Sequence, residues 1–561
     1  MEELTKAQKG RSAIRAFKTM AGALALRGFY RPNGKSGQTL EEALRTLSPE
    51  IYGSMNDPRR IEIKGLEYVL DRLPRGIESC NRVVLTAQED FRDTPFESIQ
   101  PLKRRRISYR VSRREICFVI TRGLSEIYDI LTHITFLNIE AKKIYQRMTD
   151  DRGETTVEWK ELESYLKNGA APEGAVLDQA LWDLSILLGR TYQETRATYA
   201  SLEKSRKSFN SNSGLFQIVH GLGRRMALET EDKDEAMMVY FTPPLQEMIG
   251  HHRYAENWAR QIKDRLAENG LLQRSLHIIS ANMHSVVNIL YGWSALQGEP
   301  RAEADKDLYR FVRGIRGKEQ AVRSFAADHG LMEVPDVSGA KIDCQIIDTA
   351  KVADLAFHPA AELETEKIRE NQPVLLVMDY AFGTQAFEVM DELLDQLCTG
   401  TDLQPLNIGS ISIMGKAGIL PGKKGDIILA TAHVVEGTTD NYMVRNDLCR
   451  EDFGEDVEVY TGPMVTVLGT SLQNRDVLER FQATTWRAVG LEMEGGHYQR
   501  AVSAAMIRGH IPKDVKLRYA YYASDNPLVS GQTLASGGMG EEGIKPAYLI
   551  TRVILKKILW G

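Results

Sequence analysis

The sequence has few cysteines and lacks the short motifs of the commonest metal, phosphate-loop and serine-nucleophile enzymes. Its cysteines are dispersed and include no CxxC pair: Cys80, Cys117, Cys344, Cys398 and Cys449. Such a set is typical of reduced thiols in the cytosol and argues against a disulfide-stapled scaffold. No HExxH, Walker loop or GxSxG segment is present. We therefore expect no metal and no organic cofactor.

The chain also lacks a strong charge imbalance and an uninterrupted apolar run. Its formal net charge is -5, so neither nucleic acid nor an anionic membrane is an expected partner. The most apolar stretch, around residues 116–139, is interrupted by charged residues such as Arg122, Glu126 and Asp129, which makes a membrane span costly. The first residues lack the apolar core of a signal peptide. We expect a cytoplasmic protein.

The chain is long enough for about two to four domains, and its character changes along its length. Up to residue 268, apolar residues recur at the spacing that lines one face of a helix. Examples are Ile120, Leu124, Ile127, Leu131 and Ile134, then Leu181, Leu184 and Leu188, and finally Trp258, Ile262 and Leu266. We predict an all-α domain over residues 1–268, with a regulatory or oligomerisation role.

From residue 269 to 561, short apolar runs alternate with helical patterns. The runs are Leu276–Ala281, Ile342–Ile347, Val374–Met378, Ile408–Met414, Asp426–Ala430, Val457–Val467, Ala488–Leu491 and Leu517–Ala523. They indicate a sheet covered by helices on both faces, so we predict an α/β domain. A long charged insertion over 293–340 is expected to be a surface excursion or a subunit contact. Ligands of such sheets bind beyond the carboxyl ends of the strands.

One of these strand ends carries two carboxylates. The segment Val489–His497 reads VGLEMEGGH, an apolar strand that ends in Glu492 and Glu494 and turns through two glycines into a helix. Residues two apart on an extended segment face the same side, and carboxylates there are placed to accept hydrogen bonds from a sugar diol. The alternative is a solvated pair of glutamates before a helix.

A second polar group follows another apolar strand. The segment Tyr521–Pro527 reads YYASDNP. Burial at a strand end can raise the pKa of Asp525 and let its carboxyl group donate a proton to a leaving base. The alternative is an ordinary turn, because Ser, Asp, Asn and Pro all favour turns.

Together these segments resemble the signatures of the nucleoside phosphorylase and nucleosidase superfamily. Met493-Glu494 resembles its Met-Glu strand-to-helix signature, and Ser524-Asp525 resembles the Ser-Asp that follows. Its first strand, its Gly-Ala-Gly loop and the Gly-Asp strand after that loop have counterparts, in order, in Leu276–Ala281, Ile413–Leu420 and Gly425–Leu429. The likeness is greatest to AMP nucleosidases, through Thr461–Thr466, Asn474–Asp476 and Ser524–Leu528. The resemblance implies a phosphorylase-type mixed central sheet.

The resemblance also implies cleavage of the N-glycosidic bond of a purine nucleoside or nucleotide. In the family, the residue that matches Asp525 protonates the base at N7, and the one that matches Glu494 binds the ribose hydroxyls, with Met493 against the sugar. General acid help is typically worth about 10²–10⁴ in rate. The further substrate-binding candidates in these segments are Glu492, Ser524, Asn526, Gly415 and Thr466. Family members are generally oligomers, so a homo-oligomer is expected.

The nucleophile's activating group is where the sequence departs from the family. Nucleosidases that act on methylthioadenosine carry acidic residues after the first strand, whereas Asn282–Ser285 contains none. His284 is the candidate catalytic base in that stretch. Lys416 stands where the Gly-Ala-Gly loop normally starts with a small or hydroxyl residue. A cation there could hold inorganic phosphate, as co-substrate or effector, or the phosphate of a nucleotide.

Three other segments are candidate anion sites. Gly383-Thr384 begins a helix after a predicted strand, where free N–H groups bind anions. Arg475 lies in the segment that resembles the 5′-phosphate region of AMP nucleosidases. The basic run Lys103–Arg106 is a candidate for binding nucleotide, nucleic acid or an acidic partner, and a solvated helix face is the ordinary interpretation.

These patterns favour a purine nucleosidase that releases a base and ribose or ribose 5-phosphate from an AMP-like substrate. Two alternatives stay open. One is a phosphate-dependent nucleoside phosphorylase that uses the same residues. The other is a regulator that senses nucleotides without turnover, which the missing acidic residue and the unmatched helical half favour.

Overall fold

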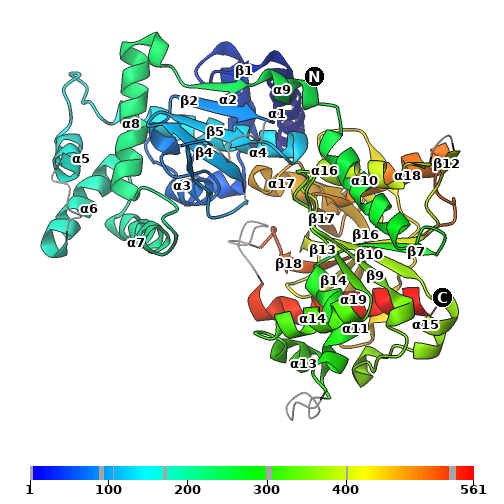
Figure 1. Ribbon diagram of the computed structural model, residues 1–561. Coiled ribbons are helices and arrows are strands. Elements are labelled where there is room, and N and C mark those ends of the chain that lie inside the picture. Colours follow the sequence, from blue (N-terminus) through cyan, green and yellow to red (C-terminus); the bar gives the residue numbers. More distant parts are fainter. Residues whose placement is uncertain are drawn as a thin grey trace. The chain divides into compact units, whose positions relative to one another are not determined.

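The computed structural model describes residues 4–87, 94–104, 106–167, 173–297, 306–399, 402–529 and 539–560 (Figure 1). The chain divides into two compact units. Unit 1 comprises Met1–His251 with Ser471–Val477, and unit 2 comprises His252–Thr470 with Leu478–Gly561. The predicted division after residue 268 differs from this one, because α10 (Arg253–Glu268) belongs to unit 2 and buries Trp258 in its core.

Unit 1 contains a six-stranded sheet as well as helices, so the prediction of an all-α half is wrong. The sheet order is β1-β6-β2-β5-β4-β3, and β2 is parallel to both of its neighbours. The strands are β1 (Phe29–Tyr30), β2 (Arg82–Thr86), β3 (Glu97–Ser98), β4 (Ile107–Ser112), β5 (Glu115–Val119) and β6 (Met238–Phe241). The helices are α1 (Lys6–Arg27), α2 (Lys35–Leu47), α3 (Ile63–Leu70), α4 (Gly123–Gln146), α5 (Val157–Lys167), α6 (Gly174–Leu188), α7 (Tyr192–Phe209), α8 (Leu215–Glu231) and α9 (Pro243–Met248).

The basic run Lys103–Arg106 is folded partly into unit 1 and does not form a solvated helix face. Arg106 is buried and pairs with Asp129 of α4, and Arg104 Nε lies 3.2 Å from the same carboxylate. Lys103 stays near the surface, where its Nζ lies 2.9 Å from Asp71. Arg105 lies outside the described residues. The two described arginines therefore serve buried ion pairs, which destabilise a fold strongly when one partner is removed.

The predicted α/β domain is confirmed in unit 2 as a mixed sheet. Its path is β15-β14-β16-β17-β13-β7-β10-β9-β8, and β18 pairs with both β13 and β14, which closes β14, β16, β17, β13 and β18 into a ring. The strands are β7 (Leu276–Ser280), β8 (Leu331–Val334), β9 (Cys344–Asp348), β10 (Val374–Met378), β13 (Ile408–Ile419), β14 (Ile427–Val435), β15 (Asn441–Met443), β16 (Val459–Thr466), β17 (Gly490–Glu492) and β18 (Lys516–Asp525). A separate pair is β11 (Leu397–Thr399) and β12 (Asp402–Gln404). Each predicted strand is present.

Alternate residues along the central strands of unit 2 enter two separate cores. Ile278 of β7 packs in one core and Ile279 in the other, as the two-residue period of a strand requires. The first core is covered by α10, α16 (Gln385–Leu394) and α18 (Gly495–Arg508). The second is covered by α11 (Met283–Ala295), α13 (Leu308–Gly314), α14 (Glu319–Asp328), α15 (Thr365–Asn371) and α19 (Ile544–Leu559). Figure 1 shows these helix layers on the two faces of the sheet.

The insertion over 293–340 is more than the predicted surface excursion. In its described part, α13, α14 and β8 bury Phe311, Val322 and Leu331 in the second core. The many charged residues of this segment suggested an exposed loop, but its apolar residues lie on one face of the described helices and pack against the core. None of the helices in the described ranges combines the length and the hydropathy that a bilayer span needs.

Candidate active site

The two polar motifs meet on either side of β13. Gly418 of this strand pairs with Leu491 of β17 on one side and with Asp525 of β18 on the other. Neighbouring strands lie roughly 4.8 Å apart, so the backbones of Leu491 and Asp525 are separated by roughly 10 Å. The fold therefore brings two segments that are distant in sequence within reach of one small ligand.

Asp525 ends β18 as a buried carboxyl group, with 4% of its surface exposed. The Ser524 hydroxyl donates to Oδ1 at 2.5 Å, whereas Oδ2 is buried and has no hydrogen-bond partner in the described part of the chain. Burial raises the pKa of Asp525, against the opposing effects of the Ser524 hydrogen bond and the Lys416 charge. A carboxyl group with a raised pKa and an oxygen that no other protein group uses is suited to give a proton to a ligand atom.

Asn526 fixes the backbone that follows β13. Its Nδ2 donates to the carbonyl oxygens of Leu420 and Gly422, at 3.1 and 2.8 Å. The side chain thereby ties the end of β18 to the turn between β13 and β14. These bonds make Asn526 a positioning residue for Asp525, and its predicted contact with substrate stays a prediction.

Glu492 lies at the centre of a buried hydrogen-bond network. Its Oε1 accepts from Thr466 Oγ1 at 2.5 Å and lies 3.3 Å from His433 Nδ1. Its Oε2 accepts from the backbone N–H groups of Glu494, at 2.5 Å, and of Gly495. Burial opposes ionisation of Glu492, but the bonds from His433, Thr466 and Gly495 outweigh it and lower the pKa. The carboxylate thus holds the first turn of α18, whose N–H groups have no partner within the helix.

The glycines after Glu494 allow α18 to begin this close to the sheet. A Cβ on Gly495 would overlap the Tyr521 hydroxyl and the His433 ring, and one on Gly496 would overlap Thr466 Oγ1. His433 is absent from the sequence motifs. It comes from β14, and only the pairing of β14 with β16 brings it beside the Met-Glu segment. A lone histidine in an apolar strand is the one signal that could have indicated it.

Glu494 links the starts of two helices. It is the N-cap residue of α18, and its Oε1 accepts from the backbone N–H of Gly383, 3.0 Å away, just before α16. Gly383 has a φ of 56°, a conformation that glycine adopts without strain. The Gly383-Thr384 helix start is predicted to bind an anion, and the anion found there is the Glu494 carboxylate. Met493, before it, is buried.

A tyrosine outside the predicted motifs lies beside these groups. Tyr380 follows β10 and is 42% exposed. It approaches β13 so closely that a Cβ on Gly415 would lie 3.5 Å from its ring, and it is hydrogen bonded to Tyr522 of β18. A partly exposed ring at the strand ends offers a flat apolar face to a heterocycle. Its position directly after a buried strand is the signal that could have found it.

The remaining predicted residues lie at other positions. His284 is exposed in the first turn of α11, where its charge adds to the effect of backbone hydrogen bonds in lowering the pKa of Glu319. Lys416 is exposed on β13. Arg475 belongs to the segment grouped with unit 1, and its backbone N–H lies 3.4 Å from Glu50 Oε1. The catalytic role of His284 and the phosphate contacts of Lys416 and Arg475 stay predictions.

Several solved structures match half of this chain at low similarity. A futalosine hydrolase mutant and a 5'-methylthioadenosine/S-adenosyl homocysteine nucleosidase, from Helicobacter pylori and Campylobacter jejuni respectively, each show 12% identity, cover 51% of this chain and 98% of their own, and give a TM-score of 0.30. Isoform 2 of uridine phosphorylase from Schistosoma mansoni shows 11% identity, covers 51% of this chain and 89% of its own, and gives a TM-score of 0.29. Scores of this size decide nothing about activity.

The chain belongs to DUF6909, a family of unknown function, which matches residues 38–303 and 304–560. None of the curated proteins compared with the chain matches it. The chemistry of the site therefore has to follow from its own residues.

Proposed function

We propose that unit 2 hydrolyses the N-glycosidic bond of a purine nucleoside or nucleotide, with an AMP-like substrate. The observation that carries the proposal is Asp525, a buried carboxyl group at a strand end with a raised pKa and, within the described part of the chain, no hydrogen-bond partner for Oδ2. Ribosyl C–N cleavage passes through an oxocarbenium-like state, as glycoside cleavage does, and a purine leaves readily only when its ring is protonated. The Met-Glu and Ser-Asp segments also resemble the signatures of nucleosidases.

In the proposed reaction, the proton on Asp525 passes to N7 of the purine while the C1′–N9 bond breaks. The oxygen of a water molecule bonds to C1′, and the water's proton is returned to solvent or to Asp525. Glu494 accepts hydrogen bonds from the ribose hydroxyls, and its bond from Gly383 fixes its direction. The exposed ring of Tyr380 stacks on the base. The products are the free base and ribose or ribose 5-phosphate.

The position of Glu494 argues against a phosphate nucleophile at the start of α16. Its carboxylate occupies the N–H of Gly383, the helix start where a phosphate would otherwise bind. Two like charges 4 Å apart repel by about 4 kcal/mol at an effective dielectric constant near 20. A phosphate at this place would have to displace the carboxylate or bear that repulsion.

The products distinguish hydrolysis from phosphorolysis. We expect the full chain to release base at the same rate in phosphate-free buffer and in buffer with inorganic phosphate, and to form no ribose 1-phosphate. Chromatography of the base and ³¹P spectra of the sugar product measure both. Strict dependence of base release on phosphate would assign the site to a phosphorylase.

The pH dependence of kcat reports the protonation of Asp525, because this carboxyl group must carry a proton to act as the acid. Because burial raises its pKa, activity is complete below that pKa and declines as the pH rises through it. The Lys416 charge opposes the raised pKa, so Lys416→Gln is expected to move this alkaline limb to higher pH. The matched control is Lys513→Gln, at an exposed lysine. An unshifted limb in Lys416→Gln would contradict the assignment of the limb to Asp525.

The second candidate function is a regulator that senses nucleotides without turnover, and the residues after β7 favour it. No carboxylate stands there to activate water, and the Asn282 side chain is used to cap α11, where it accepts from the His284 N–H at 3.1 Å. A regulator would bind the same nucleotides through the same residues but release no base. Ligand binding without base release from the wild type would decide for it.

A further inference from the structure

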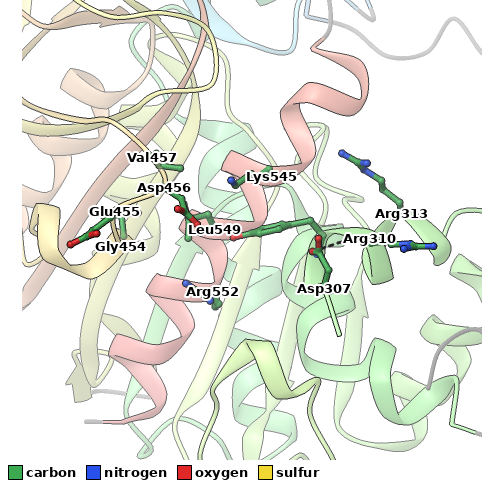
Figure 2. A pocket seen from close by; sticks show the side chains of 12 residues that line it. Asp307, Arg310, Arg313, Gly454, Glu455, Asp456, Val457, Lys545, Leu549 and Arg552 are labelled. Carbon is green, nitrogen blue, oxygen red and sulfur yellow. Dashed lines mark hydrogen bonds between the residues drawn. The ribbon is translucent and has the colours of Figure 1, made fainter. Parts of the chain in front are cut away.

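A hollow in unit 2 has a volume of about 560 Å³, the size of pockets that hold small organic ligands. It lies between the start of α13, the turn before β16 and one face of α19 (Figure 2). None of its lining residues belongs to the candidate active site. A ligand of this cavity therefore does not depend on the proposed hydrolase activity.

One wall of this cavity is cationic and comes from α19. Lys545, Leu549 and Arg552 are spaced at four and three residues, so they share one face of the helix. Arg552 Nη1 donates to the Ala360 carbonyl at 3.1 Å, which holds the guanidinium in place, while its Nε is buried and has no partner among the described residues. Lys545 is exposed. A fixed arginine with an unused donor, on the same helix face as an exposed lysine, suits a phosphate group.

Two further arginines border the cavity from α13. Arg310 and Arg313 line its other side, and Figure 2 shows the Arg310 side chain pointing away from Lys545 and Arg552. They add to the positive potential around the opening without converging on the same point.

The opposite wall carries carboxylates and a tyrosine. Glu455 and Asp456, in the turn before β16, are both exposed. Tyr309 is half-buried. Burial raises the pKa of its hydroxyl, an effect that the Arg552 charge opposes and the charges of Asp307 and Asp456 reinforce. Carboxylates accept hydrogen bonds from hydroxyl groups, and the tyrosine ring with Leu549 offers apolar contact to a carbon skeleton.

We propose that this cavity binds a phosphate ester that carries free hydroxyl groups, either a sugar phosphate or a nucleotide. The phosphate lies against Lys545 and Arg552, and the hydroxyls donate to Asp456. The arrangement discriminates against inorganic phosphate, because the carboxylates repel a bare anion and have no hydroxyl to bind. It also discriminates against a neutral sugar, which leaves the buried Arg552 donor without an acceptor.

Calorimetric titration of the full chain tests the proposal with ribose 5-phosphate as probe. Lys545→Glu is expected to weaken binding about tenfold or more, the usual effect of removing a charge-assisted hydrogen bond. Lys513→Glu is the matched control and should bind within about twofold of the wild type. Lys545 is exposed in the first turn of α19, where glutamate is compatible with the helix, and circular dichroism confirms folding.

Competition by AMP, the Asp456→Asn variant and titration with inorganic phosphate identify the class of ligand and can overturn the proposal. AMP that competes for the Lys545-dependent site assigns it to nucleotides as well, whereas absence of competition assigns it to sugar phosphates. Asp456→Asn should weaken the binding of ribose 5-phosphate but not that of inorganic phosphate, whose binding should strengthen because a repelling carboxylate is removed. The proposal fails if ribose 5-phosphate does not bind at millimolar concentration or binds Lys545→Glu as tightly as the wild type. It also fails if inorganic phosphate binds as tightly as the ester.

Discussion

Replacement of Asp525 by asparagine is expected to lower kcat for base release by about 10²–10⁴, the usual worth of a general acid. Asparagine keeps the shape of the side chain and can still accept the hydrogen bond from Ser524, but it has no acidic proton to give to the purine. Affinity for the nucleotide should stay within a few-fold of the wild type, because the proton transfer belongs to the transition state. Initial rates by chromatography and affinity by thermal shift measure the two quantities separately.

The control for this change is Asp514→Asn, an exposed aspartate in the loop before β18. It alters the same functional group on the same unit and should leave the rate unchanged. If Asp525→Asn and Asp514→Asn release base equally fast, Asp525 is not the acid. If Asp525→Asn loses affinity as strongly as rate, the residue holds the ligand instead of protonating it.

The second large effect concerns stability. Glu492→Ala is expected to lower the free energy of unfolding of unit 2 by about 3–5 kcal/mol, as the loss of one partner of a buried charged network does. The change leaves His433, Thr466 and the backbone N–H groups at the start of α18 without their acceptor. Denaturant unfolding, with hydrogen exchange of residues 490–508 to assign the transition, measures it.

The difference in unfolding free energy between the wild type and Glu492→Ala should decrease as the pH falls. Because the folded state lowers the pKa of Glu492 from its ordinary value of 4.5, its stabilising effect is complete above that value. The effect disappears as the pH falls through the lowered pKa, so wild type and Glu492→Ala should converge in acid. Glu370→Ala, at an exposed glutamate of α15, should change stability by no more than about 0.5 kcal/mol at any pH. A Glu492→Ala protein as stable as Glu370→Ala at neutral pH would show that the network is not structural.

Most of the sheet of unit 2 was predictable because eight of its strands are separate apolar runs, whereas β8 and β15 were not predicted. The sheet of unit 1 was not. The apolar stretch at 116–139 contains the end of a strand, β5, and most of a helix, α4, with only Ile120, Thr121 and Arg122 between them. Helical spacing dominates the longer part and hides the shorter strand, since a brief apolar run has no period of its own.

The prediction for Glu492 and Glu494 failed for a different reason, the local backbone conformation. The expectation that both carboxylates face one ligand assumes an extended chain through Glu494. The strand ends at Glu492, and Glu494 has a φ of -122° and a ψ of -31°, so the chain has already turned. The two side chains therefore have different partners, Glu492 inside the fold and Glu494 at Gly383.

The residues that the motifs omit are those defined by strand pairing. His433 reaches Glu492 because β14 pairs with β16, which in turn pairs with β17. Tyr380 follows β10 and lies near Gly415 of β13, although β7 separates these two strands in the sheet. A single sequence records which residues follow each strand but not which strands are neighbours, so these contacts could not be derived from it.

Release of a purine base by the wild-type chain tests the central claim most directly. The full chain is incubated in phosphate-free buffer with AMP, adenosine, inosine and methylthioadenosine, and free base is measured by chromatography beside the Asp525→Asn protein. We predict steady release of base with ribose or ribose 5-phosphate from at least one of these compounds, and a loss of about 10²–10⁴ in the variant. Binding of the same compounds with no base released by the wild type would contradict the account.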